Sequence, residues 1–121
     1  MLGLAPIFFY IAITLIDIHP IAKQWVHWMV LNIPVDCTSL PEGASPSKMP
    51  KDSKELKNSF GNDGYGGSQP SKGSGVHKYI FTVYALNEPV SASGFLSEEA
   101  FLKLVSGKVL AKAQLTGTFS R

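Results

Sequence analysis

Residues 77–86 read HKYIFTVYAL, and after Lys78 this segment is apolar or aromatic at nearly every position. Aromatic and β-branched residues favour extended backbone on a pleated surface. The run ends at Asn87 and Pro89, residue types that interrupt strands. A nearly continuous apolar run of this length is typical of a strand inside a sheet. The segment therefore predicts a buried strand and makes β-structure the framework of the chain.

Two earlier segments have the same character. Residues 25–33, WVHWMVLNI, are followed by Pro34, and residues 7–16 are rich in β-branched and aromatic side chains. Residues 1–16 are shorter than the roughly 20 apolar residues that span a bilayer. They also lack the basic start and the small-residue cleavage site of a secretory signal. We expect strands over 7–16 and 25–33, no stable membrane span, and a targeting segment only as the alternative for residues 1–16.

One helix is predicted near the end of the chain. Ser97 can cap its start and Gly107 suits its end. Acidic residues follow the cap, where the helix dipole favours negative charge, and three apolar side chains share one face: Phe101, Leu104 and Val105. Residues 109–119 fit helix or strand by periodicity. We predict a strand, because Thr116 to Thr118 are poor helix formers.

Composition sets the size and the class of the protein. With 121 residues, of which 45% are hydrophobic, the chain can form one small domain over residues 1–121. The order of elements predicts a mainly β domain with a peripheral helix. A net charge of +2 argues against a nucleic-acid partner. The lone Cys37 cannot form an intrachain disulfide, which fits a cytoplasmic protein.

The connection over residues 34–76 is too long for an ordinary loop in a compact domain. Its lysine-rich part, residues 45–57, is predicted to be a solvated surface loop. Residues 61–79, GNDGYGGSQPSKGSGVHKY, are glycine-rich and fit either a slack linker or the wall of a binding site. Glycine backbone N–H groups can approach an anion closely, which is the argument for a wall.

Three polar residues are candidates for a site, because they interrupt apolar strands or mark their ends: Asp17, His27 and His77. His27 interrupts an apolar strand, where a polar group needs a hydrogen-bond partner. His77 and Tyr79 lie two residues apart and so share one face of their strand. A satisfied core histidine and solvent-facing strand residues are the alternatives. No metal-ligand spacing, nucleotide motif or nucleophile motif is present, so we expect no metal, no cofactor and no catalytic residues.

Several segments in order carry a resemblance to a known family. After Asp17 these are HWMVLNIP at 27–34, TSLPEG at 38–43, NSFGNDGYGG at 58–67, GSGVHKYIFTVYAL at 73–86 and KVLAKAQLTGTFSR at 108–121. Together they resemble the prokaryotic phosphatidylethanolamine-binding proteins of the Raf kinase inhibitor-like type. The resemblance covers about residues 14–121.

The resemblance implies a β-sandwich with a central antiparallel sheet, a second smaller sheet and a peripheral helix. It also implies a small pocket for a phosphate or a similar anion. Carried onto this chain, the pocket residues are Asp17, His27, Gly64, Tyr65, Gly66, Gly67, His77 and Tyr79. Asp17 is expected to orient and charge a histidine, or to accept a hydrogen bond from an amine or hydroxyl of the ligand.

This chain departs from the family pattern at two places that matter. His19 stands where the family's aspartate-rich motif has its second acid. The family's N-terminal strands have no counterpart here, which predicts an exposed sheet edge and an exposed apolar face. Residues 1–13 or a second copy of the chain could cover that face, and a truncated reading of a longer gene is the third explanation.

Three functions follow as hypotheses. The first is a non-enzymatic module that binds phosphate, a phosphorylated small molecule or a phospholipid head group, and regulates a partner protein. The second is a kinase or protease inhibitor that acts through residues 45–57. The third is a weak phosphoester hydrolase that uses His27 and His77, ranked last because no nucleophile is identifiable.

Overall fold

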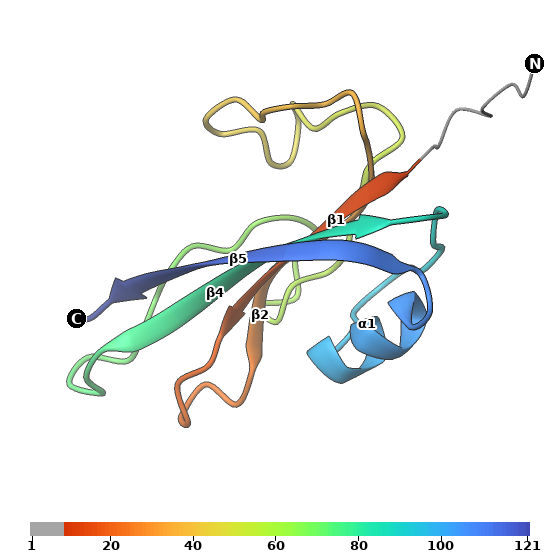
Figure 1. Cartoon of the computed structure of the whole chain (residues 1–121). Helices are drawn as coiled ribbons and strands as arrows, with labels where there is room; N and C mark the ends of the chain where they lie inside the picture. The colour runs from red at the N-terminus through yellow and green to blue at the C-terminus, as the bar shows by residue number, and fades with distance from the viewer. Residues whose placement is uncertain (1–8) are drawn as a thin grey trace, which may run out of the picture.

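A computed structural model describes residues 9–121 as one five-stranded antiparallel sheet with one helix (Figure 1). The strands are β1 (Tyr10–Asp17), β2 (Trp25–Pro34), β3 (Lys54–Glu55), β4 (His77–Leu86) and β5 (Val109–Phe119), in the spatial order β3-β2-β1-β4-β5. The helix α1 spans Glu98–Val105. The mainly β fold class is confirmed. The strand predicted over 7–16 is present from Tyr10, and its first part, 7–8, lies outside the described residues.

The central strand β1 pairs with β2 on one side and β4 on the other, so apolar side chains are buried on both faces of the sheet. On one face, Ala12 and Ile16 of β1 belong to the core that α1 covers. On the other face, Leu15 packs with Trp28 and Val30, partly beneath the connection that follows β2. Burial on two faces explains why these strands are nearly continuous apolar runs.

The helix α1 lies between Ser97 and Gly107, the residues that the sequence predicted to bound it. The Ser97 hydroxyl accepts a hydrogen bond from the Ala100 N–H at 3.1 Å. Phe101 and Val105 are buried against the sheet, and the Phe101 ring lies 5.1 Å from the Tyr84 ring, centroid to centroid. Gly107 adopts a positive φ of 78°, which glycine tolerates best and which ends the helix.

The lysine-rich segment 45–57 is more firmly attached to the sheet than we expected for a surface loop. Lys54 and Glu55 form β3, which pairs with Leu31 and Val30 of β2. The next residue, Leu56, is buried in the core, and its N–H donates to the Met29 carbonyl at 2.9 Å. The high lysine content of the segment gave no indication of the buried Leu56 or of the short strand β3, because contacts with β2 decide both.

The outer strand β5 is exposed along its whole length. Within residues 9–121 no strand pairs with its outer edge, and no second sheet covers the face that carries Val83 and Leu115. Leu115 is 71% exposed, which agrees with the expected exposed apolar face. The second, smaller sheet implied by the resemblance is not formed by the described residues. The described part of the chain has no helix with the length and hydrophobicity needed to cross a bilayer.

Candidate functional site

A cavity of about 340 Å³ lies where three strands come together. In the antiparallel sheet, Asp17 at the end of β1 is the pairing partner of Trp25 at the start of β2 and of Tyr79 near the start of β4. The register therefore gathers polar side chains that are distant in the sequence. The polar residues of the lining are Asp17, His27, Gln69, Ser71 and His77, and the aromatic ones are Trp25 and Phe60.

His77 is held by the carboxylate of Asp17. The Nδ1 atom of His77 lies 2.6 Å from Oδ2 of Asp17, and both side chains are at least 95% buried. The other carboxylate oxygen, Oδ1, accepts the His19 N–H at 2.9 Å. Because a carboxylate can only accept, Nδ1 of His77 carries a proton. This geometry agrees with the predicted role of Asp17 in orienting a histidine.

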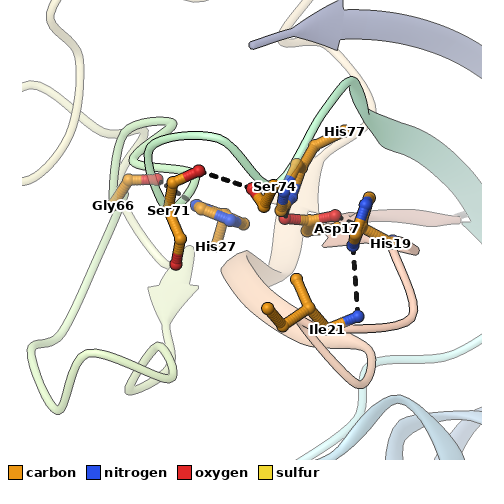
Figure 2. Close-up of polar contacts among 8 residues, drawn as sticks. All are labelled: Asp17, His19, Ile21, His27, Gly66, Ser71, Ser74 and His77. Carbon is orange, nitrogen blue, oxygen red and sulfur yellow. Dashed lines mark hydrogen bonds and ion pairs between the residues drawn. The ribbon is translucent and has the colours of Figure 1, made fainter. Parts of the chain in front are cut away.

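His27 is held by the glycine-rich loop through two hydrogen bonds. Its Nδ1–H donates to the Gly66 carbonyl, and the Gly66 N–H donates to the His27 carbonyl, both at 2.8 Å. Nδ1 must be the protonated nitrogen, because a carbonyl oxygen is an acceptor. Figure 2 shows His27 between Gly66 and His77. The Nε2 atom of His27 is therefore the atom that can exchange a proton with a ligand in the cavity.

Of the predicted site residues, only Asp17, His27 and His77 line this cavity, whereas Gly64, Tyr65, Gly66, Gly67 and Tyr79 do not. The Gly64 N–H donates to the Leu56 carbonyl at 3.2 Å, and the Tyr65 N–H donates to the Ser45 hydroxyl at 2.9 Å. With Gly66 also engaged, these backbone donors do not face an anion in the cavity, contrary to the expectation for the loop. A direct ligand contact by Gly67 stays a prediction.

Glycine is nevertheless required at position 66 for packing. A Cβ atom there would lie 2.5 Å from the ring of Phe60, which forms part of the cavity lining. Such a distance is shorter than any ordinary carbon contact, so a side chain would displace the ring. Gly66 therefore shapes the site through close approach to Phe60 and through its hydrogen bonds to His27.

Tyr79 borders the site through its ring. The ring meets His27 edge to face, with centroids 5.2 Å apart. Its hydroxyl is buried and has no hydrogen-bond partner within residues 9–121. Burial raises the pKa of Tyr79 above its ordinary value. The side chain therefore keeps a neutral, buried hydroxyl behind the residues that line the cavity.

The raised tyrosine pKa values predict an alkaline transition. Burial raises the pKa of both Tyr79 and Tyr84, so these side chains ionise in the unfolded chain before they ionise in the folded one. The stabilisation that results is complete below pH 10 and is lost as pH rises through the folded-state pKa values. In an absorbance titration at 295 nm, we expect Tyr79 and Tyr84 to ionise last and together with unfolding. Tyr84→Phe should remove one late-titrating group, and an unchanged titration curve would contradict the assignment.

His19 contributes to the site in a way that sequence reasoning missed. Its ring stacks on His77 with centroids 3.9 Å apart and an interplanar angle of 8°. The Ile21 N–H donates to Nδ1 of His19 at 3.1 Å, which requires that nitrogen to be unprotonated. A neutral imidazole thus covers the face of His77 (Figure 2). The substitution of an acid by His19 was visible in the sequence, but the stacking depends on the turn after β1.

Ser74 was also missed by sequence reasoning. Its Oγ lies 2.8 Å from Nε2 of His77 and 2.5 Å from the Ser71 carbonyl oxygen. The available signal was a serine three residues before His77 in a glycine-rich turn, which is weak because such turns are usually flexible. Both ring nitrogens of His77 are therefore engaged, one by Asp17 and one by Ser74.

Comparison with known proteins identifies the family. The family model of the phosphatidylethanolamine-binding proteins matches residues 10–120. This chain belongs to the phosphatidylethanolamine-binding protein family. The chain is 38% identical over 101 residues to a UPF0098 protein of Methanothermobacter thermautotrophicus, covering 83% of this chain and 66% of the relative. It is 36% identical over 104 residues to the Escherichia coli UPF0098 protein YbhB, covering 84% and 65%.

Solved structures support the same assignment to the phosphatidylethanolamine-binding protein family. The crystal structure of Escherichia coli YbcL superimposes with a TM-score of 0.81 at 29% identity, covering 98% of this chain and 76% of YbcL. A Chlamydia trachomatis homologue, CT736, has a TM-score of 0.68 at 24% identity, covering 92% of this chain and 71% of CT736, a likeness of fold alone. The chain spans about two thirds or less of the length of the curated relatives it matches.

Proposed function

We propose that this protein binds small phosphorylated molecules in the cavity between His27 and His77, and that phosphate itself is the recognised group. Family membership supports a ligand-binding module. The observation that carries the choice of an anion is the hydrogen bonding of His77. Nδ1 is bonded to Asp17, and Nε2 to a serine hydroxyl whose own proton goes to the Ser71 carbonyl. All three contacts are satisfied together when His77 is an imidazolium.

The charge distribution of the site fits an anion of modest size. An imidazolium at His77 neutralises the carboxylate of Asp17, which lines the same cavity and would otherwise repel an anion. His27, when protonated at Nε2, adds a charge-assisted donor, the stronger class of hydrogen bond. Gln69 lies on the same lining and has an amide donor. The cavity of about 340 Å³ is at the small end of ligand sites.

Calorimetric titration with inorganic phosphate and phosphoethanolamine tests the proposal. We expect saturable binding that tightens as pH falls from 8 to 5.5, because protonation of His27 adds a donor and a charge. His27→Gln should weaken binding at pH 5.5 by at least about tenfold, the effect of losing one charge-assisted hydrogen bond. Comparing the two ligands separates recognition of phosphate from recognition of the attached amine.

The matched control is Lys103→Gln, which removes one positive charge from the exposed surface of α1. It should leave phosphate affinity unchanged at moderate salt, because the charge is exposed and screened. An affinity that is flat between pH 8 and 5.5, or equal losses in His27→Gln and Lys103→Gln, would contradict the proposed site.

The inhibitor alternative receives no specific support from the structure. Segment 45–57 contains β3 and the buried Leu56, although Lys48, Lys51 and Lys54 are exposed. Deleting the segment would remove part of the core and could not test inhibition alone. The module that binds an anion therefore remains the function we propose, and regulation of a partner protein is a further part of that proposal.

A further inference from the structure

Ser74, His77 and Asp17 form a continuous hydrogen-bonded chain beside the cavity. Ser74 Oγ is 2.8 Å from His77 Nε2, and His77 Nδ1 is 2.6 Å from Asp17 Oδ2. His77 and Asp17 are buried, whereas Ser74 is half-buried. Figure 2 shows the three side chains close together. A hydroxyl, an imidazole and a buried carboxylate in this order are the components of a serine nucleophile and its base.

Counting the hydrogens shows that the hydrogen-bonded series Ser74–His77–Asp17 has two protonation states. When His77 carries both ring protons, Nε2–H donates to Ser74 Oγ, and the Ser74 hydroxyl donates to the Ser71 carbonyl at 2.5 Å. When Nε2 loses its proton, the only hydrogen that can join Nε2 and Oγ is the hydroxyl hydrogen of Ser74. A rotation of that O–H bond from Ser71 to His77 then places the serine proton on its base.

We propose that Ser74 is a nucleophile activated by His77 and Asp17, and that small activated esters reach this half-buried serine beside the cavity that His77 and Asp17 line, for acyl transfer. This goes beyond the proposed binding of phosphate. Ser74 Oγ attacks the acyl carbon as its proton passes to His77 Nε2, and the alcohol leaves with that proton. Water then attacks the acyl carbon of the acyl-serine, giving its proton to Nε2, and the acid is released as the proton returns to Oγ.

Asp17 has a positioning role in this reaction. Its Oδ2 holds Nδ1–H of His77, so that the lone pair of Nε2 is directed at the serine. The carboxylate is itself fixed by the His19 N–H at 2.9 Å. The neutral ring of His19 covers one face of the base at a centroid distance of 3.9 Å. These contacts fix the orientation of the imidazole, which is the part of the arrangement that a flexible loop could not supply.

The two states predict opposite pH dependences for binding and for acyl transfer. The titratable groups that face His77 are Asp17, His19, His27 across the cavity and Tyr79 on the same strand, and Lys78 is its exposed neighbour. Nε2 can accept the serine proton only in the state in which it carries no proton of its own, and higher pH favours that state. Nucleophilic reactivity of Ser74 should therefore rise between pH 6 and pH 8.5, while phosphate affinity falls.

The experiment uses diisopropyl fluorophosphate with the full chain at pH 6 and pH 8.5, followed by intact mass and peptide mapping. Ser74 Oγ bonds to phosphorus, fluoride leaves, and the serine proton goes to His77. We expect one adduct on Ser74, formed faster at pH 8.5, and turnover of 4-nitrophenyl acetate with the same pH profile. Ser74→Ala should abolish both, and His77→Gln should slow labelling about 100-fold or more, the contribution of a general base.

The control is Ser93→Ala, which removes an exposed serine from the segment between β4 and α1 and should leave labelling unchanged. Absence of an adduct on the folded chain at pH 8.5, or labelling of Ser74 that His77→Gln does not slow, would overturn the proposal. Calorimetric titration of the unsubstituted chain with inorganic phosphate at pH 5.5 separates the two proposals. Labelling of Ser74 without phosphate binding would reject only the anion site, and phosphate binding without labelling would reject only the nucleophile.

Discussion

Replacing Phe101 with alanine is expected to lower the free energy of unfolding by about 3–5 kcal/mol, the range for deletion of a buried aromatic side chain. Phe101 is fully buried, and it is the largest fully buried side chain of the described residues. Its ring packs against Tyr84 of β4 at 5.1 Å and attaches α1 to the sheet. The change is measured by urea denaturation followed by circular dichroism.

The adjacent position supplies the matched control. Leu102 lies on the same helix but is 45% exposed, so Leu102→Ala should change the free energy of unfolding by no more than about 0.5 kcal/mol. A similar loss in both variants would mean that helix propensity, and not burial against β4, decides the effect. A loss below about 1 kcal/mol in Phe101→Ala would contradict the packing of α1 on the sheet.

Replacing Asp17 with alanine should destabilise the fold by about 3–5 kcal/mol at pH 6, the cost of leaving one member of a buried ion pair without its partner. The variant removes the acceptor of His77 Nδ1–H and of the His19 N–H together. Both atoms of the His77 pair are shielded from water, so solvent cannot replace the lost contact well. Urea denaturation at pH 6 measures the loss.

A double-mutant cycle identifies the source of this loss. If the Asp17–His77 contact is responsible, Asp17→Ala combined with His77→Ala should cost less than the sum of the two single changes, by about 1 kcal/mol or more. Strict additivity would show that the two side chains do not interact in the folded protein. That result would also remove the basis for an imidazolium at His77 and for an activated Ser74.

Much of the site could be predicted from the sequence, but its connections could not. His27 stood out because an imidazole inside an apolar strand needs a partner, and the structure supplies the Gly66 carbonyl. Asp17 stood out as a polar residue at the end of an apolar strand, but only the family resemblance joined it to the histidines, since nothing local links it to a residue 60 positions away. The loop glycines were expected to offer N–H groups to an anion. Those of Gly64 and Gly66 are instead used by backbone carbonyls, which no sequence pattern specifies.

The sequence by itself determined the long strands and the helix, because apolar runs, strand-breaking residues and the Ser97 cap act within a few positions of the chain. Only the tertiary structure decided which polar groups meet. The register of β1 between β2 and β4 places Asp17 beside the starts of both neighbours. The short strand β3 likewise joins the edge of β2. These contacts join residues far apart in the chain, so they depend on the packing of the whole sheet and carry no local signal. Ser74 and His77 are only three positions apart, but their contact depends on the conformation of the glycine-rich turn before β4.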